Sequence, residues 1–215
     1  MAHLADIDFV LSPLNGLRSR NVLILGAGHF RSHATPLLSD PDWEVWALNL
    51  VAPLDEVGRL RADRWFDLHQ REAQSPDDLR WIGKCPVPIY LTPDAMTASP
   101  NAVAYPLDEI ERWAAESYWA CTFAYQIALA LFEGYKRIAL YGVELAYGSS
   151  RERTVEWANV AYWIGRARGM GVKVIVPPTS SLGQHPARYG FEYRDELEKV
   201  KEYTDMIASD AGVIG

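Results

Sequence analysis

Cysteine is scarce in this 215-residue sequence, and its scarcity excludes several kinds of protein. The two cysteines, Cys85 and Cys121, form no CxxC pair and no spacing typical of a metal site. A disulfide framework needs more cysteines than this, so the sequence predicts a reducing, cytoplasmic location.

Long hydrophobic runs are also missing. No apolar run approaches the roughly 20 residues that a membrane-spanning helix needs. Asp6 and Asp8 stand among the apolar residues near the start of the sequence, and carboxylates there are not typical of a signal peptide. The sequence therefore predicts no membrane partner.

An excess of positive charge is absent as well, since the formal net charge is −7. The phosphates of nucleic acid select basic surfaces, so nucleic acid is not expected as a partner. The sequence also lacks a GxSxG elbow, a GxxxxGK(S/T) loop and an HExxH pair. These absences argue against serine hydrolases of that kind, P-loop enzymes and zinc proteases.

What the sequence does contain is a regular alternation of strand and helix patterns. The segments that are expected to be strands are Val22–Leu25, Glu44–Leu50, Arg64–His69, Pro88–Thr92, Arg137–Glu144 and Val172–Val176. The expected helices are Pro76–Gly83 with Ser75 as its N-cap, Leu107–Phe132 in one or two pieces, Trp157–Arg168 and residues 192–209. Short helices are expected at Asp55–Arg61 and from Pro36, with Thr35 as the N-cap. Loops are expected between Thr92 and Tyr105 and at Ala146–Val155.

Strands that alternate with helices at this spacing predict βαβ units. We therefore expect an α/β fold, a three-layer Rossmann-like domain with a mostly parallel sheet of about six strands. No linker or internal repeat divides the sequence, so residues 1–215 are expected to form a single domain. Within it, residues 1–20 would form an N-terminal hook or helix. The helix at 192–209 would pack on the sheet or form the contact of a homo-oligomer.

The glycine turn after the first strand is the first candidate for a binding site. The sequence NVLILGAGH, residues 21–29, places Gly26 and Gly28 directly after four apolar residues. Glycine lets backbone N–H groups approach a ligand, and such a turn at the edge of a sheet can hold a phosphate. We predict that Gly26, Gly28 and His29 contact a nucleotide. Arg31 replaces the third glycine of the dinucleotide fingerprint, so a purely structural turn is the alternative.

Polar residues end three other expected strands, and the carboxyl ends of parallel strands share one edge of the sheet. Asn49 would bond a base or ribose, or else only cap a loop. Asp67 would contact the ligand, and His69 would serve as a general base or be purely structural. Glu144 would act as a base, bind sugar hydroxyls or hold Mg²⁺ through water; the alternative is an exposed loop carboxylate.

The start of the long helix adds two further candidates, Thr122 and Tyr125. The hydroxyl of Thr122 and the N–H groups of the first helical turn would bind a phosphate, because a helix N-terminus carries partial positive charge. The alternative for Thr122 is an ordinary buried threonine that bonds to its own helix.

The segment Tyr118–Glu144, YWACTFAYQIALALFEGYKRIALYGVE, resembles a pattern found in a broad group of Rossmann-like proteins. The group includes phage-encoded proteins of unknown role, the MptE-like pterin diphosphokinases and, more distantly, the bacterial sialyltransferases that use CMP-sialic acid. The segments EVWALN, DRWFDLH and IGRARGMGVKVIVPPTSSL are similar to the phage-encoded members as well, so the resemblance extends from residue 21 to about residue 193.

This resemblance implies a nucleotide-type ligand held by the glycine turn, Asn49 and the start of the long helix. Cys121 replaces the first serine of the pattern and Glu144 replaces its aspartate. The catalytic histidine of the sialyltransferases follows the fifth strand, whereas residues 145–176 contain no histidine. Another base, Glu144 or His69, would have to act in its place.

Three functions remain open from the sequence. The first is a group-transfer enzyme of the glycosyltransferase type that uses a nucleotide-sugar, with His69 or Glu144 as the base. The second is an MptE-like diphosphokinase that uses ATP and Mg²⁺, with the metal held by Asp67 or Glu144. The third is a non-catalytic protein of phage origin that binds or sequesters a nucleotide.

Overall fold

A computed structural model describes residues 21–49, 60–145, 152–178 and 180–183, without the side chains of His29, Phe30 and residues 152–153. Apart from Gly183, these residues belong to one compact unit that spans residues 1–182. The predictions for residues 1–20, for most of Asp55–Arg61 and for the helix at 192–209 lie outside the described residues. A single domain over the whole chain stays a prediction.

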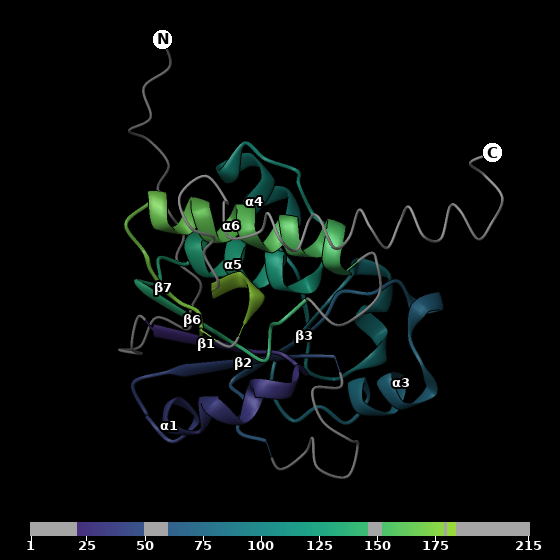
Figure 1. Cartoon of the computed structure of the whole chain (residues 1–215). Helices are drawn as coiled ribbons and strands as arrows, with labels where there is room; N and C mark the ends of the chain where they lie inside the picture. Colours follow the sequence, from purple (N-terminus) through teal and green to yellow (C-terminus); the bar gives the residue numbers. More distant parts are fainter. Residues whose placement is uncertain (1–20, 50–59, 146–151, 179, 184–215) are drawn as a thin grey trace, which may run out of the picture. The chain divides into compact units, whose positions relative to one another are not determined.

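A seven-stranded parallel sheet forms the centre of the fold and confirms the predicted α/β class (Figure 1). Its strands are β1 (Asn21–Leu25), β2 (Glu44–Leu48), β3 (Arg64–Asp67), β4 (Ile89–Leu91), β5 (Ala102–Ala104), β6 (Arg137–Tyr141) and β7 (Lys173–Ile175). Their order across the sheet is β5-β4-β3-β2-β1-β6-β7, and every neighbouring pair is parallel.

Helices cover both faces of this sheet, which gives the predicted three layers. On one face lie α4 (Leu107–Ala114), α5 (Thr122–Phe132) and α6 (Trp157–Gly169), and on the other lie α1 (Thr35–Leu38) and α3 (Pro76–Ile82) (Figure 1). β1 is buried along nearly its whole length because side chains on both of its faces meet helices. Its unbroken apolar run is typical of such a central parallel strand.

Local sequence explains where several helices begin and end. Ser75 caps α3, because its hydroxyl accepts a bond from the Asp78 N–H while the Asp78 carboxylate accepts one from the Ser75 N–H. The long helical segment is divided in two, as the sequence allowed, because Ala115 adopts a left-handed φ of 49° and ends α4. Thr35 is the first residue of α1, and its hydroxyl donates to the Ser32 carbonyl instead of capping the helix.

Three predictions about local structure are wrong. The segment Ala102–Ala104, expected in a loop, pairs with β4 as the edge strand β5. This strand was missed because it has only three small residues, and the Ser, Pro and Asn residues before it indicate a turn. Residues 152–155, also expected in a loop, belong to the π-helical turn Glu152–Glu156 before α6. The strand expected to reach Glu144 ends at Tyr141, because Gly142 turns the chain at φ +67°.

A buried ionic cluster lies at the amino edge of the sheet, opposite the predicted site. The guanidinium of Arg64 donates to Glu44 at 2.7 Å and to Glu133 at 2.7 Å. It also donates to the hydroxyls of Tyr90 and Tyr135, at 3.0 and 3.4 Å, and Tyr135 in turn donates to Glu44. These bonds and nearby charges raise the pKa of Arg64 despite its burial, so the cluster holds a permanent cation between two carboxylates.

The same cluster ties the end of α5 to the starts of β2 and β3, since Glu133 and Tyr135 follow α5 directly. The helix therefore runs from the carboxyl edge of the sheet, where it begins, to the amino edge, where it is anchored. In the part of the chain that the structure describes, no helix is long and apolar enough to cross a membrane.

Candidate functional site at the carboxyl edge of the sheet

The strand order reverses direction at β1, and this reversal indicates where on the sheet a ligand would bind. The chain proceeds outward from β1 to β5 and then returns to the other side of β1 with β6. In open parallel sheets, ligands bind beyond the carboxyl ends of the strands at such a switch point. Two loops meet there, the glycine turn that follows β1 and the segment Gly142–Glu144 that follows β6.

The glycine turn packs backbone to backbone against the segment after β6. The Gly26 N–H donates to the Tyr141 carbonyl and the Gly28 N–H donates to the Gly142 carbonyl, each at 2.8 Å. A Cβ on Gly26 would overlap the Gly142 carbonyl and come within 2.8 Å of Phe123. These two N–H groups are therefore engaged within the fold, and the need for glycine follows from close packing alone. A contact of Gly26, Gly28 or His29 with a ligand stays a prediction; the His29 side chain lies outside the described atoms.

We expect Gly26→Ala to lower the free energy of unfolding by about 2–3 kcal/mol, because the added methyl group would have to displace backbone atoms. The matched control is Gly165→Ala on α6, where a new Cβ meets nothing within 4 Å. That control should raise the free energy of unfolding by about 0.5–1 kcal/mol, because alanine favours the helix. Urea denaturation measures both, and equal effects of the two substitutions would contradict the packing described here.

Glu144 lies directly against this turn and is buried, with 6% of its surface exposed. Its carboxylate occupies the place that a Cβ on Gly28 would take. Its backbone carbonyl accepts a bond from the Ser181 hydroxyl, and that hydroxyl accepts one from Trp157 Nε1 at 3.1 Å. Glu144 is therefore fixed from two sides, and the alternative of an exposed loop carboxylate is wrong.

Asp67 and His69 form a pair at the carboxyl end of β3. Asp67 is 1% exposed, and its Oδ1 lies 3.3 Å from His69 Nδ1 and accepts a bond from Gln74 Nε2 at 3.1 Å. The His69 ring is 48% exposed. The bond to Asp67, aided by the charges of Asp78 and Glu156, raises the pKa of His69 although partial burial opposes it. A buried carboxylate thus orients an imidazole whose other nitrogen is available to a ligand.

We expect nuclear magnetic resonance titration of the His69 ring to give a pKa above the ordinary value of 6.5. Asp67→Asn should return that pKa toward the ordinary value, because the largest cause of the shift is removed. A pKa that Asp67→Asn leaves unchanged would contradict the pairing.

The raised pKa of His69 also makes the stability of the folded chain depend on pH. Because the pKa of His69 is higher in the folded chain than in the unfolded chain, the pair contributes stability that is fully present below about pH 6.5. That contribution is lost as pH rises through the folded value. Half of the ring is exposed, so solvent screening keeps the contribution small.

Asn49 follows β2 in a left-handed conformation with φ 45°, next to β3. Its N–H donates to the Phe66 carbonyl and its own carbonyl accepts a bond from Trp65 Nε1, both at 2.9 Å. Its side-chain Oδ1 is buried without a hydrogen-bond partner within the described structure. Gln126 on α5, which the sequence analysis did not select, shows the same feature: Nε2 donates to the Ala47 carbonyl while Oε1 has no partner there.

The N-terminus of α5 lies at the same edge. Thr122 is the first residue of the helix and is buried, and the preceding Cys121 makes no side-chain cap. The next residue, Phe123, is the one that approaches Gly26, so the start of the helix adjoins the glycine turn. The first N–H groups of α5 therefore lie beside the switch point.

Tyr125 belongs to a different environment. Its ring stacks on Trp119 with centroids 4.7 Å apart and meets Tyr105 edge-on at 5.2 Å. The Tyr105 hydroxyl donates to the Tyr125 carbonyl. Burial raises the pKa of the Tyr125 hydroxyl. These contacts pack Tyr125 against residues of the segments before and after α4, and its predicted contact with a ligand stays a prediction.

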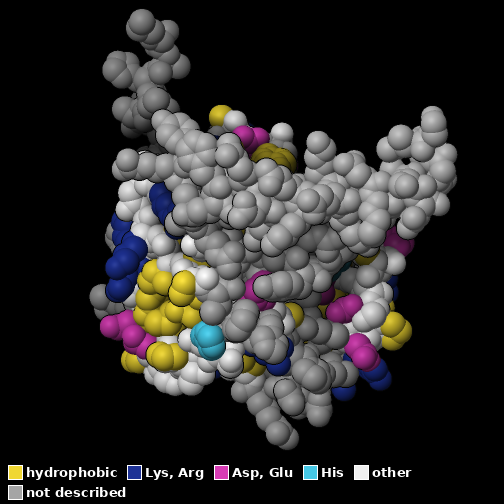
Figure 2. Space-filling view, in the orientation of Figure 1, with side chains coloured by type: hydrophobic (Ala, Val, Ile, Leu, Met, Phe, Trp, Pro, Cys, Tyr) yellow, Lys and Arg dark blue, Asp and Glu magenta, His cyan; other side chains and the backbone are white. Residues whose placement is uncertain are grey.

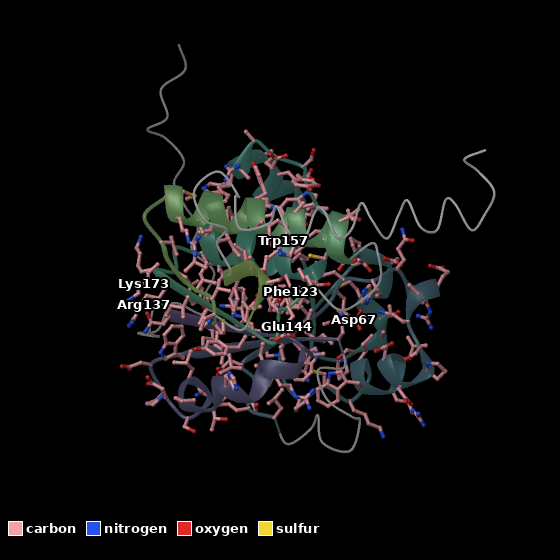
Figure 3. The ribbon with its side chains drawn as sticks, in the orientation of Figure 1. Asp67, Phe123, Arg137, Glu144, Trp157 and Lys173 are labelled. Carbon is pink, nitrogen blue, oxygen red and sulfur yellow. The ribbon has the colours of Figure 1, made fainter. Side chains whose placement is uncertain are left out.

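The structure thus connects two groups of predicted residues. Gly26, Gly28 and Glu144 form one group, and Asp67 and His69 form the other. Glu156, whose charge acts on His69, is followed directly by Trp157, which reaches Glu144 through Ser181. Figure 3 labels Trp157, Phe123 and Glu144 one above another, with Asp67 to one side of them.

Sequence reasoning missed Gln126, Phe123, Trp157 and Ser181 at this edge. A glutamine within the apolar helix TFAYQIALALF was the one available signal for Gln126. Within the described residues, no group of three or more His, Cys, Asp or Glu side chains has the arrangement of a metal site.

Comparison with known proteins adds little to this geometry. No protein family matches the sequence, and no curated protein matches it. Among solved structures, the monofunctional α-2,3-sialyltransferase Cst-I from Campylobacter jejuni aligns with 93% of this chain and 99% of its own length, at 13% sequence identity and a TM-score of 0.42. It is a protein of the kind that the sequence distantly resembles, but values this low carry no conclusion about fold or function.

Proposed function

We propose that this chain is a nucleotide-binding group-transfer enzyme of the glycosyltransferase type that uses a nucleotide-sugar as donor. The observation that carries the proposal is the Asp67–His69 pair, a half-exposed imidazole oriented by a buried carboxylate at the ligand-binding edge of a parallel sheet. Such a pair is suited to remove a proton from an acceptor hydroxyl.

In this proposal His69 is the general base. Nδ1 faces Asp67, so Nε2 is the nitrogen that meets the acceptor. As the acceptor oxygen forms its bond to the anomeric carbon of the sugar, the bond from that carbon to the nucleotide phosphate breaks and the hydroxyl proton passes to Nε2. The leaving group is the nucleotide. Since only the neutral ring accepts a proton, turnover should rise with pH through the raised pKa of His69.

The first turn of α5 is the proposed phosphate contact. Its N–H groups and the helix dipole favour negative charge, and Thr122 adds a hydroxyl. The Gly26 and Gly28 N–H groups already donate to the carbonyls of Tyr141 and Gly142, which makes the helix N-terminus the better phosphate contact. Asn49 is the proposed nucleoside contact, because its buried Oδ1 lacks a donor among the described residues. Glu144 is the alternative base.

Thermal-shift measurements with CMP, UDP, GDP, ATP and ADP-ribose, each with and without Mg²⁺, test this proposal, because a ligand that binds the folded chain raises its melting temperature. We expect a pyrimidine nucleotide or a sugar nucleotide to stabilise the chain without a metal. Stabilisation by ATP alone and only with Mg²⁺ would indicate the diphosphokinase instead. Tight nucleotide binding without turnover of any acceptor would indicate a sequestering protein. If no nucleotide raises the melting temperature, the proposal fails.

A further inference from the structure

Two carboxamide side chains are fully buried in the described part of the chain, Gln126 on α5 and Asn159 on α6. Asn159 uses both ends of its amide, because Oδ1 accepts a bond from the Ala120 N–H and Nδ2 donates to the Tyr118 carbonyl, each at 2.9 Å. Gln126 uses one end: Nε2 donates to the Ala47 carbonyl at 3.4 Å, while Oε1 has no partner among the described residues. A buried polar atom without a hydrogen bond costs stability, so Oε1 of Gln126 calls for an explanation.

The unpaired atom of Gln126 is an acceptor. A backbone carbonyl can only accept a hydrogen bond, so the Ala47 carbonyl fixes the amide with Nε2 toward the strand. The reversed amide would bring two oxygen atoms together. Oε1 of Gln126 therefore requires an N–H or O–H group that none of the described residues supplies.

A second unpaired acceptor lies at the end of the same strand. Ala47, which Gln126 contacts, is the last residue but one of β2, and Asn49 follows that strand. Asn49 Oδ1 is also buried without a partner among the described residues. Thr122, at the proposed phosphate contact, lies about one helical turn before Gln126 on α5. Both acceptors therefore belong to the edge of the sheet at which the proposed ligand binds.

We propose that Gln126 Oε1 and Asn49 Oδ1 accept hydrogen bonds from the two hydroxyls of a ribose. A ribose presents two O–H donors on adjacent carbons, one for each acceptor. Asn49 follows Gly28 by 21 residues. In dinucleotide-binding folds, an acidic residue about 20 residues beyond the glycine motif accepts the ribose 2′-hydroxyl.

This inference rests on the proposed nucleotide binding and names the sugar that the site recognises. A 2′-deoxyribonucleotide lacks one of the two donors, so it leaves one buried acceptor unpaired. A site built to bond a hydroxyl discriminates strongly against the analogue without it. The site therefore selects ribonucleotides over deoxyribonucleotides, and Gln126 determines part of that selection.

Titration calorimetry on the full chain with CMP and dCMP, and with AMP and dAMP, tests the inference. We expect each ribonucleotide to bind about 10–100-fold more tightly than its deoxy form, because the deoxy form leaves a buried acceptor unpaired. Gln126→Met should reduce this preference by about tenfold.

The outcomes of this titration separate the inference from the proposed function. Equal binding of the ribose and deoxyribose forms would overturn the inference and leave the proposed function standing. No binding of any nucleotide would overturn both. If CMP binds more tightly than UMP, and dCMP more tightly than dUMP, while ribose and deoxyribose forms bind equally, the acceptors recognise the base and the inference is wrong.

A nucleotide could also bind a basic surface through its phosphate alone. Figure 2 shows Lys and Arg side chains gathered beside hydrophobic ones at the end of the molecule where Figure 3 labels Arg137 and Lys173. Lys173 is exposed at the first position of β7, at the amino edge of the sheet. Lys173→Gln is therefore a control that should change neither nucleotide affinity nor the preference for ribose. Loss of nucleotide binding in this variant would overturn the inference.

The stability of the ligand-free chain supplies a readout that needs no nucleotide. Gln126→Met keeps a side chain of similar size and removes the unpaired oxygen, so the melting temperature should rise by about 2–4 °C. The matched control is Asn159→Leu, which removes an amide bonded at both ends and should lower the melting temperature by at least about 2 °C. A fall in both variants would show that Gln126 is a structural amide, bonded for example to an internal water, and would overturn the inference.

Discussion

Arg64→Ala is expected to lower the free energy of unfolding by about 3–5 kcal/mol, one of the two largest effects we predict. The substitution removes the cation that neutralises Glu44 and Glu133 and leaves Glu44 buried with an uncompensated charge. It also removes the donors to Tyr90 and Tyr135. Urea unfolding followed by tryptophan fluorescence measures the change.

The control for this prediction is Arg112→Ala on α4. Arg112 is 76% exposed and its ion pair with Glu109 is at the limit of contact, 4.0 Å. Its loss should change the free energy of unfolding by less than about 1 kcal/mol. A loss below about 1 kcal/mol for Arg64→Ala as well would show that the cluster does not fix α5 to the sheet.

His69→Gln is expected to reduce turnover of the proposed glycosyl transfer by about 10²–10⁴-fold while the chain stays folded. Glutamine retains a polar group of similar size but cannot take up a proton. The rise of activity with pH should disappear in this variant. The assay is product formation with the nucleotide-sugar that gives the largest thermal shift, measured from pH 5 to 9.

Glu144→Gln separates the two candidate bases. The change is isosteric, and it keeps the contact with Gly28 that the structure describes. If His69 is the base, Glu144→Gln should retain the rise of activity with pH even where turnover falls. If turnover is lost in Glu144→Gln and retained in His69→Gln, the roles assigned to these two residues are wrong.

The class of fold could be predicted from the sequence, because the signals for most of its strands and helices are local and strong. The apolar run of β1 and the capping box of α3 each indicate one element, and alternation of strands and helices indicates a parallel sheet. The edge strand β5 was missed because three residues between turn formers carry no period. The early end of β6 was missed because the positive φ of Gly142 follows from its packing against Gly26, which lies far away in the sequence.

The candidate site was only partly predictable for a similar reason. Asp67 and His69 could be selected because a parallel sheet brings strand ends to one edge, and the structure pairs them. The engagement of the Gly26 and Gly28 N–H groups could not be foreseen, because their partners are the carbonyls of Tyr141 and Gly142, which lie far away in the sequence. The link from Trp157 through Ser181 to Glu144 joins segments that no short-range pattern connects.

The most direct test of the account is a ¹H–¹⁵N spectrum of the chain titrated with the nucleotide that stabilises it best. A ligand at the proposed site should shift the backbone signals of Asn49, His69 and Thr122 together and leave those near Arg64, at the amino edge, unchanged. Saturable shifts confined to the amino edge, or no shifts with any nucleotide, would contradict a nucleotide site at the carboxyl edge of this sheet.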